Sequence, residues 1–331
     1  MTDLKLTDHE KKTIDILRVF AILSVITAHV SSIPGGTFIR DVLSAGYHIW
    51  SDVGVVLFLL IGGFLYHREK NDTKRYWSKR VKTLIIPWLV CSGLTYGLSC
   101  LLNGIQGIQN YFNWIFGIGS WYYYITIYFI ILASFKFIYR SNAAMFLCII
   151  LNFVSLLLSS SGIIQYNIIT PYLNVFNWCG YFAIGVLIRR YWNKIKSNTH
   201  HHMPLCATIA SLIIAILFFI IYKEKAFGYF HIETAIITLC TSFFVILIAA
   251  KLSDTPLANY LVLLGQNTYF IYLIHMPLLQ PIANRTPKIL VFDIFDPLIC
   301  FSIMIIFLLI VQVICNFIPL LKKAKWIIGL R

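Results

Sequence analysis

The sequence predicts an all-α membrane protein that crosses the bilayer many times. Of its 331 residues, 59% are hydrophobic and only 12% are charged, whereas soluble domains are about 45–50% apolar and about 25% charged. Apolar windows long enough to cross roughly 30 Å of hydrocarbon recur along the whole chain. Most Lys and Arg residues fall between these windows. Composition, periodicity and charge therefore exclude a soluble globular protein.

The apolar windows predict about ten membrane-spanning helices. The first follows a leader that carries three lysines, and it lacks a small-residue cleavage site, so we expect it to be retained as a span. The tract 105–119 could contain a re-entrant segment. No hydrophilic domain or inverted repeat interrupts the pattern, so a single membrane domain over residues 1–331 is expected. The predicted spans lie near residues 14–33, 48–66, 82–102, 121–139, 143–161, 174–191, 205–222, 231–250, 258–279 and 298–319.

The distribution of basic residues predicts the orientation. Cytoplasmic loops of membrane proteins collect Lys and Arg. With the N-terminus inside, the predicted inner segments hold 22 of the 27 basic residues. Both termini are therefore expected in the cytoplasm. The predicted outer segments keep only Arg40, Lys223, Lys225, Arg285 and Lys288.

The formal charge of +14 does not indicate a nucleic-acid partner, because the basic residues lie in short loops and not on one soluble face with aromatic residues. The eight cysteines lie in or beside apolar runs without CxxC or metal-like spacing, which predicts core thiols. We expect no metal. The triplet His200, His201 and His202 is interpreted as part of a solvated cytoplasmic loop.

The first predicted span, IDILRVFAILSVITAHV, carries three ionisable residues: Asp15, Arg18 and His29. Arg18 and His29 are separated by close to three helical turns, so both project from one face roughly 16 Å apart along the axis. Asp15 lies one turn before Arg18. Ionisable groups at membrane depth are costly and usually functional, so this helix predicts a site.

The segment LGQNTYFIYLIHMPLL places His275 on one helix face with Tyr269 and Tyr272. His275 is a candidate for function or an interfacial residue that caps a helix end. In the second predicted span, Gly62 and Gly63 favour close approach of another helix.

The longest predicted inner loop, residues 67–82, holds seven basic residues and two acidic ones. It suits a polyanion on the cytoplasmic side, or it serves as a topology signal that also contacts anionic lipid. Near the predicted outer surface, SWYYY at residues 120–124 is either an aromatic belt or the floor of a sugar site. Glu233 is a weaker acid candidate on that side.

Taken together, these pieces resemble the membrane-bound acyltransferase 3 family. The most specific are D-x-x-R-x10-H at Asp15, Arg18 and His29, and NTYFIYLIHMPLL at residues 267–279. Others are DVGVVLFLLIGGFL, with Gly62 where the family has Ser; RYWSKRVKTLIIPW; SWYYY, with Ser120 where a His often stands; and YFAIGVLI. The family's R-x-x-R motif, aligned on Arg80, places Thr83 at the second Arg, so the missing charge is assigned to Lys79 or Lys82.

The resemblance implies transfer of an acyl group, acetyl first, from cytoplasmic acetyl-CoA to a hydroxyl of a surface polysaccharide or lipid-linked sugar. It implies a bacterial inner-membrane location and no permanently bound cofactor. His29 would be the general base, with Asp15 and His275 also in the catalytic group. Basic residues would hold the CoA phosphates, and aromatic and acidic residues the sugar. The expected CoA-binding residues are Arg18, Arg75, Lys79, Arg80 and Lys82, and the expected sugar-binding residues are Trp121, Tyr122, Tyr272 and Glu233.

Two other classes of function remain open. The inner loop and the aromatic segment also resemble the polysaccharide-intercellular-adhesin subset, whose members are described as exporters or succinyl transferases. An exporter would have a continuous polar path and no dependence on acyl-CoA. A membrane receptor or scaffold would leave the phasing of Arg18 and His29 unexplained.

Overall fold

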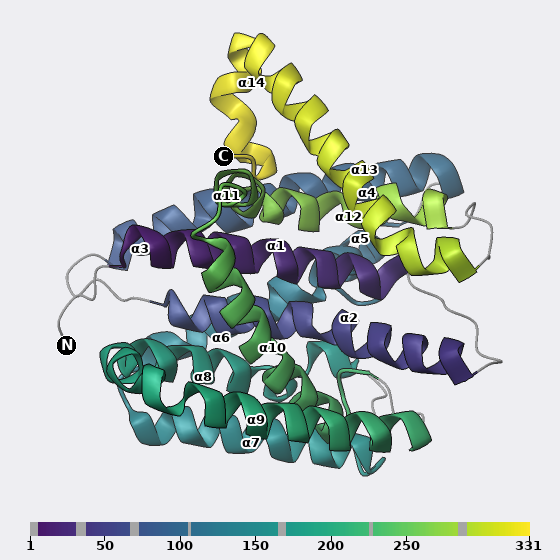
Figure 1. The fold of residues 1–331 in the computed structure, drawn as a ribbon. Helices are drawn as coiled ribbons and strands as arrows, with labels where there is room; N and C mark the ends of the chain where they lie inside the picture. Colours follow the sequence, from purple (N-terminus) through teal and green to yellow (C-terminus); the bar gives the residue numbers. More distant parts are fainter. Residues whose placement is uncertain are drawn as a thin grey trace.

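The first helix lies at the centre of the bundle. The computed structural model describes residues 6–30, 38–66, 73–104, 107–164, 170–224, 228–283 and 290–331. Helix α1 (Asp8–Val30) packs against α2 (Phe38–Phe64), α10 (Ile232–Leu252), α11 (Ala258–Gln266), α12 (Thr268–Ala283) and α13 (Leu290–Phe317) (Figure 1). The apolar window of α1 is 72% buried, against 11% for that of the peripheral helix at Met203–Lys223. Of the seven candidate spans that the structure describes, the helix that carries Asp15, Arg18 and His29 is therefore the most buried.

The other described elements are also helical. Helix α2 contacts α8, and α8 contacts α7, on one side of the centre; α4 and α12 lie on the other (Figure 1). A π-helical turn, η1 (Val81–Ile85), joins α3 to α4, and 3-10 turns occur at η2 (Pro171–Leu173), η3 (Val175–Asn177) and η4 (Lys325–Ile328). The remaining α-helices are α3 (Thr73–Arg80), α4 (Ile86–Asn103), α5 (Ile108–Phe116), α6 (Tyr123–Ile138), α7 (Asn142–Ser160), α8 (Cys179–Arg190), α9 (Trp192–Glu224) and α14 (Pro319–Ala324).

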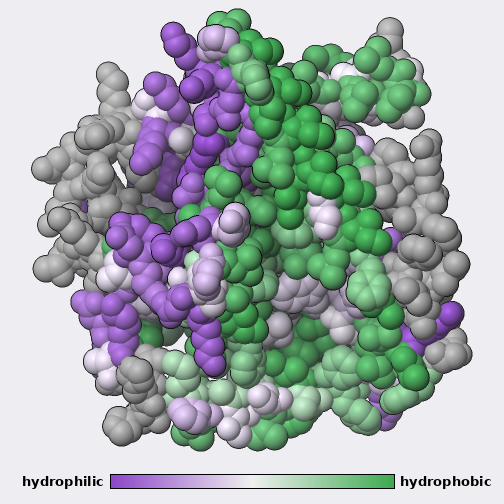
Figure 2. Space-filling view, turned by 45° about the horizontal axis from the view of Figure 1, so that its top comes forward, coloured by the Kyte–Doolittle hydropathy of each residue, from purple (hydrophilic) through white to green (hydrophobic). Residues whose placement is uncertain are grey.

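The fold is that of an all-α polytopic membrane protein, which confirms the predicted class. Seven helices among the described residues are long and apolar enough to cross a membrane, and α6 and the segment Thr268–Leu279 are shorter apolar helices. Figure 2 shows a broad hydrophobic surface, with hydrophilic residues gathered toward the side on which Figure 1 places α3 and the start of α1. The count of ten crossings and the cytoplasmic termini stay predictions.

Several predicted boundaries are wrong in detail. The expected span 258–279 is two helices, because α11 ends at Gln266 and α12 starts at Thr268. The expected span 174–191 becomes α-helical only at Cys179. The histidine triplet at 200–202, expected in a loop, belongs to helix α9, and its side chains lie outside the described residues. The tract 105–119 contains the short helix α5.

Glycines allow the central helices to approach closely, as predicted for the second span. A Cβ atom on Gly63 would lie 2.0 Å from the carbonyl oxygen of Phe182 on α8, well inside van der Waals contact. On the facing helix, a Cβ on Gly185 would lie 2.2 Å from the carbonyl oxygen of Leu60. Gly62 instead faces the Tyr128 ring of α6. Backbone contact between α2 and α8 therefore requires glycine on both helices.

The prediction that the cysteines are core thiols holds for some and is wrong for Cys206. Five of the eight are buried, and Cys100 and Cys240 are partly buried. Cys206 is exposed because it lies in α9, whose apolar window packs little against the other helices. The remaining five are Cys91, Cys148, Cys179, Cys300 and Cys315.

Candidate functional site

Asp15 and Arg18 form an ion pair at one end of the central helix. The Arg18 Nη1 atom lies 2.5 Å from Asp15 Oδ1, and both side chains are mostly buried. The second carboxylate oxygen accepts a hydrogen bond from Gln266 Nε2 at 3.4 Å. Gly265 permits this contact, because a Cβ there would lie 2.0 Å from the carbonyl oxygen of Asp15. The end of α11 therefore fixes the carboxylate that orients Arg18.

Arg18 faces a cavity of about 200 Å³ that contains two further arginines, Arg80 and Arg331. The three come from α1, from the end of α3 and from the segment after η4. No Asp or Glu stands among the described residues that line the cavity. The polar and aromatic lining also includes Thr83, Gln266, Thr268, Tyr124, Tyr128, Tyr269 and Tyr272. This lining is suited to an anion with an apolar extension.

A second cavity of about 370 Å³ shares Thr83, Gly329 and Arg331 with the first, and Lys82 lines it. Burial lowers the pKa of the Arg331 guanidinium; nearby Arg18 lowers this pKa further, Asp15 opposes that effect, and Arg80 adds to the lowering. Positive charges are thus close enough to oppose one another across the cavity mouth.

The other predicted CoA-binding residues are placed less directly. Lys79 is exposed on α3 and does not line either cavity. Arg75 lies on the same helix, but its side chain is outside the described residues. Of the two lysines assigned the charge missing at Thr83, only Lys82 lines one of these two cavities. Arg331 and Thr83 both line both cavities.

His29 and His275 meet at the other end of α1. The centroids of their rings are 5.2 Å apart. His275 is completely buried, whereas His29 is exposed. His275 Nδ1 lies 2.6 Å from the carbonyl oxygen of Tyr272; because a carbonyl only accepts, this ring nitrogen carries the hydrogen. The buried Nε2 has no hydrogen-bond partner within the described part of the chain. The pair thus combines a fixed, buried imidazole with an accessible one.

Three of the predicted sugar-binding residues surround His275. The ring of Trp121 lies 6.2 Å from the His275 ring, and the Tyr272 ring 5.6 Å from it. Both phenols donate to backbone carbonyls: Tyr272 to Trp121, and Tyr122 to Leu273 at 2.9 Å. These rings are buried, so in this conformation they support the histidine and leave little ring surface for a sugar.

Glu233 lies on another helix, α10. It lies in the first turn of α10, and no hydrogen bond or ion pair joins it to either histidine among the described residues. Its predicted role in sugar binding remains a prediction.

Tyr272 links the cavity to the histidines. Its side chain lines the cavity that contains Arg18, and its backbone carbonyl holds His275. One turn earlier, Tyr269 also lines the cavity and donates to the Leu84 carbonyl in the π-helical turn η1 at 2.7 Å. Helix α12 therefore runs from the arginine-lined cavity to the imidazole pair. Helix α1 does the same, because it carries both Arg18 and His29.

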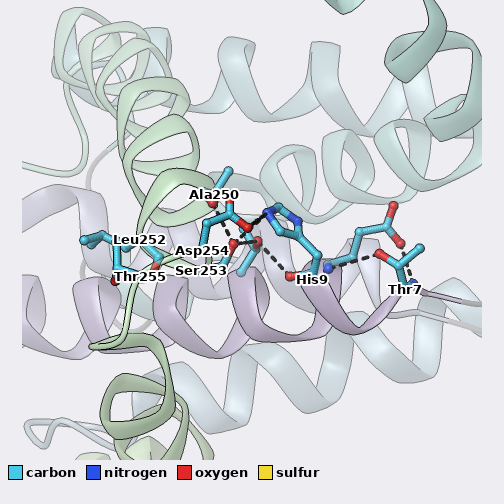
Figure 3. Close-up of polar contacts among 9 residues, drawn as sticks. Thr7, His9, Ala250, Leu252, Ser253, Asp254 and Thr255 are labelled. Carbon is cyan, nitrogen blue, oxygen red and sulfur yellow. Dashed lines mark hydrogen bonds and ion pairs between the residues drawn. The ribbon is translucent and has the colours of Figure 1, made fainter.

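A second group, His9, Ser253 and Asp254, has the residue types of a catalytic triad (Figure 3). Its geometry excludes that role. His9 Nε2 makes both contacts, at 2.8 Å to Ser253 Oγ and 3.3 Å to Asp254 Oδ1, whereas a triad uses one ring nitrogen for each partner. The Ser253 hydroxyl donates to the Ala250 carbonyl at 2.6 Å. The group ties the start of α1 to the end of α10.

Sequence reasoning missed Arg331, Gln266 and Asn267. Gln266 and Asn267 lie within the segment LGQNTYF. Two adjacent amide side chains in an apolar run could have been read as candidate polar contacts inside the bundle. Arg331 gives no such signal, because it follows an ordinary basic tail.

No group of three or more potential metal ligands occurs among the residues that the structure describes.

The chain is similar to known proteins over most of its length. A family model described as an acyltransferase domain matches residues 11–317. A protein of Staphylococcus aureus (strain MRSA252) described as "Probable poly-beta-1,6-N-acetyl-D-glucosamine export protein" is 22% identical over 295 residues, which cover 82% of this chain and 81% of that protein. No solved structure matches. The family match spans the ion pair, Arg80 and both histidines, and it ends before Arg331.

Proposed function

The chain belongs to the acyltransferase 3 family, and from this premise we propose that it transfers an acetyl group from cytoplasmic acetyl-CoA to a hydroxyl of a cell-surface polysaccharide or lipid-linked sugar. One observation carries the proposal. Helix α1 presents Arg18 to an arginine-lined cavity at one depth and, at another, the exposed His29 beside the buried His275. A long donor with a phosphorylated end and a reactive end fits this separation.

The arginine-lined cavity suits the nucleotide end of CoA. CoA carries a pyrophosphate and a 3′-phosphate, and guanidinium groups bind phosphate oxygens through paired hydrogen bonds. Arg18 is oriented by Asp15, and Arg80 lies in the predicted inner loop. The aromatic part of the lining leads toward Tyr272, which gives the pantetheine arm an apolar surface on its way to the histidines.

The histidine pair suits the transfer step. The sugar hydroxyl attacks the thioester carbonyl carbon and gives its proton to an imidazole. The tetrahedral intermediate then collapses, the carbon–sulfur bond breaks, and the proton passes to the departing CoA thiolate. Imidazole titrates near neutral pH, which suits both proton transfers. No metal is required.

We assign the base to His29 and a positioning role to His275. His29 is exposed and can meet an acceptor from outside, whereas His275 is enclosed and held by the Tyr272 carbonyl. Rings 5.2 Å apart allow the unpartnered His275 Nε2 to orient His29 after a small movement. Catalytic hydrogen bonds often shorten only when substrate binds.

Export of a polysaccharide is the second candidate, and the description of the staphylococcal relative as a probable export protein favours it. A polymer needs a continuous polar path. The arginine-lined cavity instead reaches the buried side chains of Tyr272 and Ile125, and neither histidine lines it. Succinyl transfer is a variant of the first candidate that differs in the acyl group.

The test is transfer of radiolabelled acetyl from acetyl-CoA to envelope glycan, using membrane vesicles with and without the protein. We expect label in the glycan only when the protein is present, with loss of label for His29→Ala. Labelled succinyl-CoA, supplied in parallel, distinguishes the acyl groups. Glycan that crosses the membrane without acyl-CoA, together with no transfer of either label, would favour the exporter and contradict the proposal.

A further inference from the structure

The segment after α13 folds back onto the bundle and brings Arg331 to the arginine-lined cavity. Figure 1 shows α13 rising away from the bundle and the segment after it turning at α14 and returning beside α11. We call residues 318–331 the returning segment. It follows the last residue of the family match, so family membership by itself assigns it no role.

Specific contacts seat the returning segment. The backbone N–H of Arg331 donates to Asn267 Oδ1 at 3.0 Å, and Asn267 is itself buried at the break between α11 and α12. Leu330 is only 2% exposed. Gly329 has a φ of 85° and packs beside Tyr269, a conformation that side chains other than glycine rarely adopt. The seat therefore depends on the same residues that shape the cavity.

The cavity lining brings several positive side chains together. Arg18, Arg80 and Arg331 line one cavity. The Asp15 carboxylate, which pairs with Arg18, also accepts a hydrogen bond from Gln266. Three guanidinium groups around a partly enclosed space repel one another, and a bound phosphoryl group would relieve that repulsion.

We infer that Arg331 is a ligand-binding residue that completes, with Arg18 and Arg80, a site for a phosphoryl group of the acyl donor. The inference rests on the proposed function, which supplies CoA as the donor. Arg331 contributes from the rim, where it lines both adjoining cavities. The returning segment thus supplies a cation that the matched domain lacks at Thr83. Because an anionic lipid headgroup carries the same chemistry, the test separates the two sources.

The experiment measures binding of CoA, 3′-dephospho-CoA and pantetheine to full-length protein in nanodiscs of neutral lipid and of lipid containing phosphatidylglycerol. Arg331→Ala is compared with wild type, and Lys323→Ala, an exposed lysine in the same returning segment, is the matched control. We expect Arg331→Ala to weaken CoA binding about ten- to hundredfold, as for loss of a charge-assisted hydrogen bond, with pantetheine binding and lipid dependence unchanged. Lys323→Ala should bind CoA as wild type does.

Two further variants keep the inference testable if Arg331→Ala lowers the Tm. Arg331→Lys keeps the charge without the planar fork and should give an intermediate Kd at unchanged Tm. Asn267→Ala removes the acceptor that holds the Arg331 backbone and should weaken CoA binding in the same direction. Comparing CoA with 3′-dephospho-CoA identifies which phosphate Arg331 contacts.

The failures are distinguishable. If Arg331→Ala and Arg331→Lys bind CoA like wild type while Arg18→Ala does not, Arg331 lies outside the donor site and the proposed function still stands. Loss of a phosphatidylglycerol effect with unchanged CoA affinity would assign Arg331 to lipid and overturn the inference. Failure of wild-type protein to bind CoA at all would remove the proposed donor and this inference together.

Discussion

The ring of His29, at the end of the first helix, lies 5.2 Å from the ring of His275, on the twelfth. One imidazole is exposed and the other is completely buried. Such a pair combines access for an acceptor with a fixed second ring. It is the arrangement on which the proposed proton transfer depends.

Replacing either histidine should separate their roles. His29→Ala is expected to lower acetyl transfer by about 10²–10⁴-fold, because it removes the general base. His275→Ala should lower transfer less and change its pH profile, because the base remains but is no longer oriented. Initial rates of labelled acetyl transfer across pH, with membrane abundance measured by immunoblot, provide the test. Near-wild-type transfer by His29→Ala would exclude His29 as the base.

Substitution of the His9 group should leave chemistry intact. His9→Ala and Ser253→Ala are expected to keep transfer within about twofold of wild type, since His9 uses a single ring nitrogen for both partners and the group lacks triad geometry. Thermal unfolding should show a modest decrease in Tm, because α1 and α10 lose a polar tie. Abolished transfer with unchanged Tm would mean that the site lies there instead.

Arg18→Ala should weaken donor binding more than it slows chemistry. A guanidinium at the cavity contributes charge and paired hydrogen bonds, not proton transfer. We expect the KM for acetyl-CoA to rise about tenfold or more while kcat changes little. Asp15→Asn is the companion variant, because it leaves Arg18 in place without its ion pair. Unchanged CoA affinity in Arg18→Ala would make the ion pair purely structural.

Arg80→Ala tests whether the basic inner loop binds the donor or sets topology. Six other basic residues in residues 67–82 still favour the cytoplasm, so the variant should insert normally. If Arg80 contacts a CoA phosphate, the KM for acetyl-CoA should rise and its dependence on salt should weaken, since part of the attraction is screened over about 8 Å at physiological ionic strength. Lys79→Ala, an exposed neighbour that lines no described cavity, is the control. Equal kinetics for both variants at every CoA concentration would leave the loop as a topology signal.

Gly265→Ala should destabilise the protein and damage donor binding together. Its Cβ would lie 2.0 Å from the Asp15 carbonyl oxygen, so α1 and α11 must separate, at a typical cost of about 1–3 kcal/mol for overpacking. Gly97→Ala is the matched control, because nothing lies within 4 Å of its Cβ in α4. Thermal unfolding in detergent should show a lower Tm for Gly265→Ala alone. An unchanged Tm would mean that the two helices tolerate a wider spacing.

The sequence by itself determined the helical membrane fold and the placement of Arg18 and His29 on one face of the first helix. Hydrophobic windows of spanning length and the bias of Lys and Arg are local properties, because each helix must satisfy its own backbone in lipid. The phasing of Arg18 and His29 follows from helical geometry alone. The close packing at Gly63 could also be predicted, since a pair of glycines in an apolar helix favours close approach of another helix. These features needed no knowledge of which helices are neighbours.

Only the tertiary structure decided which distant residues meet. The contact of His29 with His275 and the return of Arg331 to the cavity of Arg18 depend on how the helices pack around α1. The break at Asn267 is equally non-local, because its amide accepts from Arg331 and donates to the carbonyl of Leu263. Hydrophobic periodicity predicts which face of each helix is buried, but it does not predict which other helix packs against that face. That choice is made by side-chain fit and glycine contacts over the whole bundle.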